Sequence, residues 1–462
     1  MRFPEYTDEW DTIKIKDKFN FLRTNSFSRD KLIDTQGTVK NIHYGDIHMT
    51  YPTIVDVEQE QIPFINSFKV QIKDLNKYDF CKNGDLLIAD ASEDYEDIGK
   101  TIELIHITNS KVIGGLHTIL LRDKTNNNAL GFNGYYFQTK YFKKQIKIIA
   151  NGVSVLGINK KDLKELTIKT PFKKEQENIA SFLFNIDKKL KLLKNKKVGF
   201  IEFKHYLLQN LFPRNDELTP KLRFKMYIKD ISLMYKIFDF ENLINEKTLK
   251  SEKNNQYPIL SSTKEGIYSQ KDYFNRQIAS SKNIGYKILQ RNQLVFSPQN
   301  LWMGNININD KYDIGLVSPS YKVYDINKNI ILPSYLKYII KLPRLLHEFK
   351  ISSSQGASTV RRNLNLKLFN KIKIRIPSLE EQEKIASFLS VVDKKIDLLN
   401  QEIEYVEEYK KGLLQKMFIW RVYLFYCCIL SSEYLEIMFY IMIFFLRYVL
   451  LTLVSDLMSH IF

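Results

Sequence analysis

The chain has 462 residues, of which 44% are hydrophobic and 26% charged, so we expect a folded protein with two or more domains. Lys and Arg outnumber Asp and Glu by 69 to 52, and the net charge of +17 favours a polyanionic partner, nucleic acid before an anionic membrane. Charge that serves solubility alone is the alternative. The three cysteines, Cys81, Cys427 and Cys428, are too few for a disulfide framework or a zinc site.

The N-terminal segment carries charge where a signal peptide needs an apolar run, which predicts a cytoplasmic protein. Apolar runs at 86–89 and 118–121 stand beside polar turn signals at 83–85 and 126–128. Such spacing is typical of short strands joined by turns. We therefore predict a mixed α/β domain over residues 1–170.

A repeat follows this domain. Glu175–Leu183 recurs as Glu381–Leu389, and segments 175–212 and 381–418 share 19 identities in 38 positions at an offset of 206. Each copy comes after a proline that ends a strand-like run. The repeat means that one structural unit occurs twice in the chain.

Each copy is predicted to form one long helix, within the spacer segments 171–219 and 377–418. Apolar residues recur with alternating steps of three and four, as along the contact line (seam) of a coiled coil. At 1.5 Å per residue, 33 residues span roughly 50 Å, and a helix of that length with a narrow apolar stripe needs a partner. Two ordinary helices packed on separate domains are the alternative. The predicted seam residues are Ile179, Leu183, Ile186, Leu190 and Leu193 in the first copy, and Ile385, Leu389, Val392, Ile396, Leu399, Ile403 and Val406 in the second.

The charges of the two copies are opposite. Residues 173–204 contain nine Lys and four acidic residues, whereas residues 380–411 contain five Lys and nine acidic residues. Opposite charges favour the pairing of these two helices with each other, and antiparallel pairing would send their flanking domains to opposite ends.

The second domain is predicted over residues 220–376, with strand-like runs at 257–260 and 293–296. It scarcely resembles the first domain except at its ends. Both domains begin with an Arg-Phe pair, and both end with a Gly-x-Ser element. The predicted fold class is therefore mixed α/β (α+β): two globular domains separated by two long, antiparallel-paired helices in a pseudo-twofold repeat. The shared ends are Arg2-Phe3, Arg223-Phe224, Gly152-Val153-Ser154 and Gly356-Ala357-Ser358.

The last segment, 419–462, has a different composition. It lacks Lys, Gly, Pro, Asn and Gln and is dominated by Ile, Leu, Phe and Tyr. Glu436 and Arg447 interrupt it, so each charge-free run is shorter than the roughly 18–20 residues that span a membrane. We interpret it as a non-functional tail from read-through or a shifted reading frame, with a membrane anchor as the alternative.

The repeat and its flanking segments resemble the specificity subunits of Type I restriction-modification systems, over about residues 1–418. The second copy departs where Lys225-Met226-Tyr227 replaces Pro-Glu-Tyr and no Trp follows. The matching motifs are the start Arg2–Trp10, Tyr44–His48, Gly84–Asp94, Gly115–Thr118, and the domain ends around Gly152, Ser154, Gly356 and Ser358 with Glu175-Gln176 and Glu381-Gln382.

This resemblance implies a non-catalytic adaptor of a Type I restriction endonuclease and adenine methyltransferase complex. Each domain would read one half of an asymmetric double-stranded DNA site, and the helices would act as a ruler and dock two modification subunits. Restriction subunits would join that core. No cofactor is expected in this chain, since S-adenosylmethionine, ATP and Mg²⁺ would belong to the partners. The sequence contains no Asn-Pro-Pro-Tyr methylase motif.

Candidate base-reading residues are polar side chains in predicted turns, of types that form paired hydrogen bonds with bases. Each could instead be a solvated loop residue or a phosphate contact. Two other functions stay open: a stand-alone DNA-binding regulator with a coiled-coil stalk, and a membrane-associated coiled-coil protein. The candidates are Arg122, Lys124 and Asn126 in the first domain, and Lys282, Asn283 and Gln299 in the second.

Overall fold

The computed structural model describes residues 2–125, 127–214, 217–228, 234–273, 282–355 and 361–418. Asn126, the Gly356-Ala357-Ser358 element and the tail 419–462 lie outside the described residues. The chain forms two compact units. The first contains residues up to 195 together with the helix end from 399 onward, and the second contains 196–398. Each long helix therefore contributes one part to each unit.

The first unit is built on a sheet with strand order β2-β11-β7-β9-β5. The apolar run predicted as a strand at 86–89 is its central strand, which is buried on both faces, as a short continuous apolar run indicates. The β5–β9 pair is parallel and the other pairs are antiparallel. The strands are β2 (Phe19–Leu22), β5 (Ile54–Asp56), β7 (Leu86–Ala89), β9 (Thr101–Ile105) and β11 (Thr118–Asp123).

A second sheet in this unit has the order β10-β4-β6-β3, and β12 pairs with β8. At the predicted turn before β7, Gly84 has a φ of +83°, a conformation that glycine adopts without strain. The strands are β3 (Leu32–Ile33), β4 (Val39–Ile42), β6 (Phe64–Ile65), β8 (Ala91–Ser92), β10 (Lys111–Gly114) and β12 (Leu156–Gly157). The short helices are α1 (Ile15–Lys18), α2 (Tyr44–Met49), α3 (Phe132–Tyr136), α4 (Lys140–Ile149) and α5 (Lys160–Glu165), with 3-10 turns at Arg29–Lys31 and Ile72–Lys77.

The second unit has a smaller antiparallel sheet with strand order β15-β22-β19-β20. Three further antiparallel pairs surround it: β16 with β17, β18 with β21, and β23 with β24. The strands are β15 (Ile244–Lys247), β16 (Leu260–Ser262), β17 (Ile267–Ser269), β18 (Lys287–Gln290), β19 (Leu294–Phe296), β20 (Ile306–Ile308), β21 (Ile314–Val317), β22 (Lys322–Ile326), β23 (Ser353–Gln355) and β24 (Arg362–Leu364). The helices are α7 (Lys225–Ile228), α8 (Gln270–Tyr273), α9 (Pro333–Ile339), α10 (Pro343–Ile351) and α11 (Leu366–Asn370), with 3-10 turns at Phe240–Asn242 and Leu301–Met303.

One strand pair occurs in both units. In the first, β1 (Asp11–Lys14) pairs antiparallel with β13 (Thr167–Thr170); in the second, β14 (Lys236–Asp239) pairs antiparallel with β25 (Lys373–Ile376). In each unit the second strand of the pair leads, through the predicted proline break, into a long helix. The pair thus fixes where the helix leaves the domain.

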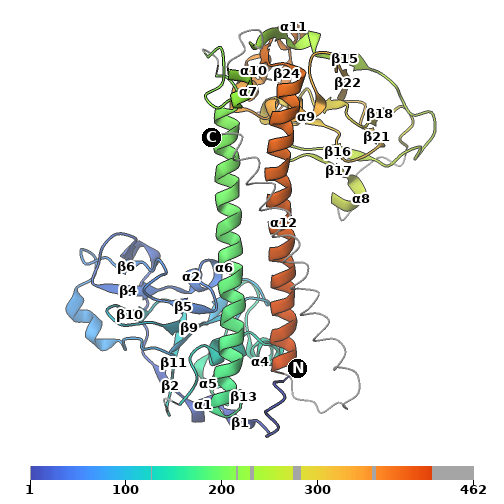
Figure 1. Ribbon diagram of the computed structural model, residues 1–462. Coiled ribbons are helices and arrows are strands. Elements are labelled where there is room, and N and C mark those ends of the chain that lie inside the picture. The colour runs from blue at the N-terminus through green and yellow to red at the C-terminus, as the bar shows by residue number, and fades with distance from the viewer. Residues whose placement is uncertain are drawn as a thin grey trace. The chain divides into compact units, whose positions relative to one another are not determined.

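The two predicted long helices are present as α6 (Lys173–Asn210, 38 residues) and α12 (Leu379–Met417, 39 residues) (Figure 1). They run antiparallel within each unit. In the first unit, Leu183 shares a core with Leu413, while Leu190, further along α6, packs with Ile403 and Val406, further back on α12. The prediction of a mixed α/β protein with two domains and a pair of long antiparallel helices is confirmed.

Candidate nucleic-acid interface and helix pair

A buried glutamate at the start of each long helix binds an arginine near the start of the globular domain in the same unit. The Nε and Nη2 atoms of Arg2 donate to the Glu175 carboxylate at 2.6 and 2.7 Å. Arg223 makes the same pair of bonds to Glu381, at 2.9 and 2.8 Å. Two parallel, charge-assisted hydrogen bonds fix position and angle together, so the domain start is held on the helix start.

The neighbouring glutamine of the motif holds the loop before the helix. The Gln176 side chain accepts from the amide of Ala129 at 3.1 Å and donates to the Pro171 carbonyl at 2.8 Å. Gln382 accepts from the Leu332 amide at 2.8 Å and donates to the Pro377 carbonyl at 3.0 Å. The Glu-Gln motif is therefore a joint between the helix and its own domain.

A second charged contact joins the two helices and a tyrosine within each unit. Asp187 accepts from the Tyr135 hydroxyl at 2.8 Å and lies 2.5 Å from the Lys410 ammonium. Its counterpart, Asp393, accepts from the Tyr338 hydroxyl at 2.9 Å and lies 2.6 Å from Lys204. Burial raises the pKa of both tyrosines, so their hydroxyls keep their protons and act as donors.

Some of the predicted seam residues pack against the other long helix, and others pack into a domain core. Leu190, Ile403 and Val406 form a cluster between the helices, with Ile186 and Leu193 at its edge. The residues in the first turns of each helix pack into a domain core instead. Ile179 and Leu183 belong to the core of the first unit, and Ile385, Leu389 and Val392 to that of the second, with Ile396 packed against it. Leu399 is also buried.

The predicted charge complementarity takes the form of ion pairs between α6 and α12. Within the first unit, Lys194 lies 2.6 Å from Glu407 and Lys189 lies 3.5 Å from Glu402. All four side chains are substantially exposed, so each pair contributes about 0–1 kcal/mol and favours the choice of partner more than stability.

Three of the family-like motifs, Tyr44–His48, Gly84–Asp94 and Gly115–Thr118, contact one another in the first unit. The Tyr44 amide donates to the Leu116 carbonyl at 3.2 Å, and the Asp90 amide donates to the His117 carbonyl at 3.0 Å. The Tyr44 ring packs edge-on against His117, with ring centres 5.2 Å apart. His117 has a φ of +53°, which a residue with a side chain rarely adopts. The result is a half-exposed aromatic surface held in a strained backbone.

The candidate residues of the first unit differ in their surroundings. Arg122 donates twice to the buried Asp85 carboxylate, at 2.9 and 2.6 Å, and to the Phe80 carbonyl at 2.7 Å. Its donors are thus largely used within the domain. Lys124 is exposed and donates one hydrogen bond, to the Lys16 carbonyl at 2.7 Å. An ammonium group has three donors, so Lys124 can still bind an anion.

In the second unit, Asn283 is buried and exchanges hydrogen bonds of 2.7 Å with both the amide and the side chain of Asn255. It therefore closes a loop. Lys282 and Gln299 are exposed. The backbone carbonyl of Gln299 accepts from the Arg362 amide at 3.1 Å, so the backbone at this exposed residue is held by β24.

Residues 7–199 and 232–408 match the family described as the Type I restriction modification DNA specificity domain. The two matches cover more than half of the chain, and each ends inside one of the long helices. The chain belongs to this family.

Two similar proteins are specificity subunits from Methanocaldococcus jannaschii. The putative type I restriction enzyme MjaX specificity subunit is 35% identical over 92 residues, which are 20% of this chain and 21% of that relative. The type I restriction enzyme MjaVIII specificity subunit is 34% identical over 104 residues, 22% of this chain and 23% of that relative. The matched stretches thus span less than a quarter of either relative.

The fold is similar to that of solved structures from the same kind of system. The S subunit of a Type-I restriction-modification system from M. genitalium is 16% identical, with a TM-score of 0.53 over 91% of this chain and 100% of the other. A chain from a structure of the type I R-M system, solved to explain complex assembly, is 11% identical, with a TM-score of 0.50 over 89% and 97%. Across the described part of this specificity-domain chain, no helix combines the length and apolar character needed to span a membrane.

The tyrosine–aspartate–lysine contact is the part of the specificity-domain joint that the sequence analysis missed. Asp187 and Asp393 repeat at the 206-residue offset, as do Lys204 and Lys410, but their tyrosines do not. Tyr135 and Tyr338 lie in the divergent domains. The signal that could have found them is a short aromatic helix, α3 or α9, preceding the joint in each domain.

Proposed function

We propose that this chain is the DNA-recognition subunit of a Type I restriction-modification complex, and that it catalyses no reaction itself. Each unit reads one half of a bipartite, asymmetric site in double-stranded DNA. The observation that carries this proposal is the duplicated joint. The Arg–Glu, Gln and Tyr–Asp–Lys contacts occur once in each unit, while the sheets they support differ in strand number and order. A repeated joint with two unlike readers suits two different half-sites.

Among the candidate residues, we expect exposed side chains to contact DNA and the bonded ones to shape the loops. Lys124, Lys282 and Gln299 belong to the first group, because their side chains are exposed. Arg122 and Asn283 belong to the second, because Asp85 and Asn255 occupy their donors. The net charge of +17 supports binding to a polyanion.

The helix pair is the proposed docking surface for two modification subunits, with restriction subunits joining that core. S-adenosylmethionine, ATP and Mg²⁺ belong to these partners. Large apolar side chains are exposed on α6 at positions that face neither α12 nor a domain core. They are Phe184, Leu192 and Val198. Large apolar side chains that are exposed on a helix are typical of a surface that a protein partner covers.

An exchange of domains tests the two-reader function. Replacing residues 1–170 with the matching domain of a relative should change one half of the methylated sequence and leave the other half unchanged. Sequencing of methylated adenines in cells that carry each chimera measures this. A change in both halves, or in neither, contradicts two independent readers.

Docking is tested by Phe184→Asp, with Asn185→Asp as a matched control that adds the same charge at the next exposed position. We expect Phe184→Asp to reduce co-purification with the modification subunit by about tenfold or more, since a charge in an apolar contact costs several kcal/mol. The control should assemble normally. Binding of specific DNA by a chain that never co-purifies with a methylase would favour the stand-alone regulator instead.

A further inference from the structure

The turn before β11 holds an exposed histidine in a fixed backbone position. His117 directly precedes this strand and has a φ of +53°, which is uncommon for a residue with a side chain. Its carbonyl accepts from the Asp90 amide at 3.0 Å, and the carbonyl of the preceding Leu116 accepts from the Tyr44 amide at 3.2 Å. The turn is therefore tied to the end of β7 and to the start of α2. Backbone of this kind occurs most often at functional sites.

The His117 ring is fixed as well. Its Nδ1 atom donates to the Asp90 carboxylate at 3.1 Å, and the Tyr44 ring packs edge-on against it. An ionised carboxylate only accepts hydrogen bonds, so in the neutral ring Nδ1 carries the proton and Nε2 is an acceptor. Among the described residues, nothing is hydrogen-bonded to this Nε2 atom, and the side chain is half exposed. The first unit thus presents an oriented acceptor that its own fold does not use.

A second histidine of this unit has nearly the same geometry at the opposite end of the sheet. His106 directly follows β9, has a φ of +56°, and donates through Nδ1 to the Asp56 carboxylate at 2.8 Å. Because β9 and β11 both pair antiparallel with β7, the end of β9 lies opposite the start of β11. In the described part of the unit, no aromatic ring packs on His106. His106 is therefore a matched comparison for His117 that lacks a neighbour like Tyr44.

The second unit has a different residue at the corresponding turn. There β22 begins beside the end of β19, as β11 begins beside the end of β7. The residue before β22 is Tyr321, and its hydroxyl donates to the Ser262 carbonyl at 3.1 Å. That polar group is used within its own unit. The two turns therefore offer different chemistry, as two readers of unlike half-sites would.

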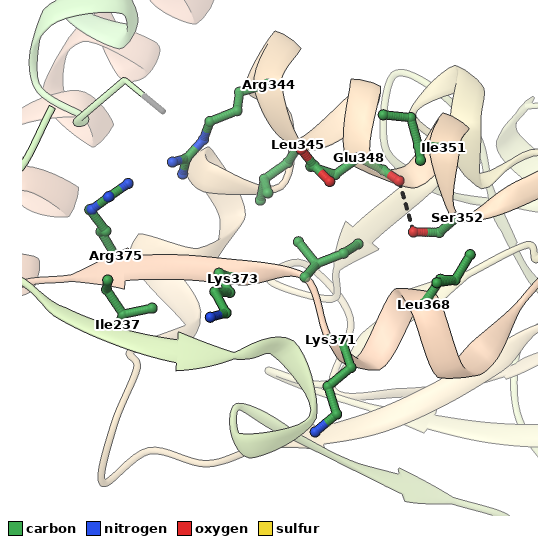
Figure 2. Close-up of a pocket in the computed structure, with 11 residues that line it drawn as sticks. Ile237, Arg344, Leu345, Glu348, Ile351, Ser352, Leu368, Lys371, Lys373 and Arg375 are labelled. Atoms are coloured by element: carbon green, nitrogen blue, oxygen red, sulfur yellow. Dashed lines mark hydrogen bonds between the residues drawn. The ribbon is translucent and has the colours of Figure 1, made fainter. Parts of the chain in front are cut away.

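Charged residues inside a domain are less suited to reading a base. Figure 2 shows a cavity of about 470 Å³ in the second unit, which Arg344, Glu348 and Lys371 help to line. The Lys371 ammonium is held by Glu241 at 2.7 Å and Asp239 at 3.2 Å. DNA sequence is read at base edges in the grooves of the duplex, so a reading group has to stand on an exposed surface. The turn that carries His117 meets this requirement.

On the basis of the DNA recognition proposed above, we propose that His117 reads one base of the first half-site, with Nε2 accepting from the amino group of adenine or cytosine in the major groove. Adenine N6 and cytosine N4 are donors on that edge. Guanine and thymine present the oxygens O6 and O4 instead, and an oxygen acceptor forms no hydrogen bond with a second acceptor. Asp90 and Tyr44 are positioning residues, because they set the tautomer and the angle of the ring.

The test compares two matched variants of the full-length chain, each assembled with a modification subunit in cells whose methylated adenines are sequenced. Asparagine tolerates a positive φ, so His117→Asn and His106→Asn each keep the backbone and remove one ring. We expect His117→Asn to relax one position of the first half, so that the base pair with its two bases exchanged between strands is also methylated. His106→Asn should keep the natural motif, and the second half should be unchanged in both variants.

A duplex that lacks the amino group at the relaxed position tests the atom itself. The purified natural complex should methylate this duplex about three- to tenfold more slowly than the normal one, the effect of one hydrogen bond. The His117→Asn complex should methylate both duplexes at the same rate. Equal rates with the natural complex would overturn the proposal.

Other outcomes would overturn it as well. These are an unchanged motif in His117→Asn, the same relaxation in His106→Asn, and a uniform loss over all sequences, which would identify His117 as a phosphate contact. Thermal unfolding should give the same temperature for both variants, and a lower temperature for His117→Asn with an intact motif would make its role structural. If the natural complex methylates no bipartite motif, the proposed function itself fails. If it does and the variant keeps that motif, only the role of His117 fails.

Discussion

The same ion pair joins helix and domain in both units, but it lies at different depths. In the first unit, the Arg2 side chain remains 22% exposed, and Trp10 donates to Glu175 at 3.3 Å. In the second, the Arg223 side chain is 7% exposed and Glu381 is fully buried, with Arg223 stacked near the Tyr235 ring. The geometry of the joint is thus conserved between the units, whereas its solvation is not, and solvation decides what the loss of one partner costs.

The largest effect is expected at the deeper pair. Glu381→Ala leaves the buried Arg223 without its carboxylate, and breaking a buried pair in this way costs about 3–5 kcal/mol. In Glu175→Ala, Arg2 can turn toward water, so the loss should be clearly smaller. Urea unfolding, with hydrogen exchange as the probe of each unit, measures the loss of stability in Glu381→Ala and in Glu175→Ala.

Glu177→Ala, at an exposed position of the same helix, is the control and should change stability by less than about 0.5 kcal/mol. Equal losses for Glu175→Ala and Glu381→Ala would show that the depth of the pair does not matter. The two units would then differ in their sheets but not in how much the Arg–Glu pair contributes to stability.

The features predicted from the sequence are those that repeat or recur periodically. The 206-residue repeat and its apolar spacing were enough to predict α6 and α12, and the opposite charges predicted their pairing. A heptad pattern cannot tell a partner helix from a domain core, however, and so the place of Leu389 in the core of the second unit was not foreseen. The Arg2–Glu175 contact joins residues 173 positions apart, and such pairing depends on the whole fold. Arg122 was chosen by residue type, which does not reveal its bonds to Asp85.

A second prediction concerns a buried acid that distinguishes the first unit. Glu103 accepts from the amides of Gly131 and Gly134 at 2.6 and 2.7 Å, yet burial raises its pKa to about 7 from an ordinary value of 4.5. The folded chain therefore holds a proton that the unfolded chain releases between about pH 4.5 and 7. Stability of the first unit should fall by up to about 3 kcal/mol as pH rises through this window.

Glu103→Gln should remove this pH dependence, because the amide does not titrate. Chemical unfolding between pH 4.5 and 8 measures the slope for each protein, and hydrogen exchange assigns it to a unit. The exposed change Glu177→Gln should leave the slope as it is. A stability that rises with pH across the window would mean that the two glycine amides keep Glu103 ionised.

The third prediction tests whether the joint behaves alike in both units. Tyr135→Phe and Tyr338→Phe each remove one hydrogen bond to a carboxylate that also binds a lysine of the other helix. Each should cost about 1.5–3 kcal/mol, and the two values should agree within about 0.5 kcal/mol. Stability measured by urea unfolding gives both. A large difference would show that only one of the two tyrosine contacts supports its helix.

The smallest effect is expected where the two helices meet in solvent. Lys194→Glu places a like charge beside Glu407, which lies 2.6 Å from Lys194 in the natural chain. Because both side chains are about half exposed, the loss should be about 1 kcal/mol or less at low salt. It should shrink as salt is added, since the Debye length falls from about 30 Å at 0.01 M to about 3 Å at 1 M. Lys196→Glu makes the same change of net charge on the same helix and serves as the control. If both variants lose equal stability, the effect comes from net charge, and the pairing of α6 with α12 rests on its apolar cluster rather than on complementary charge.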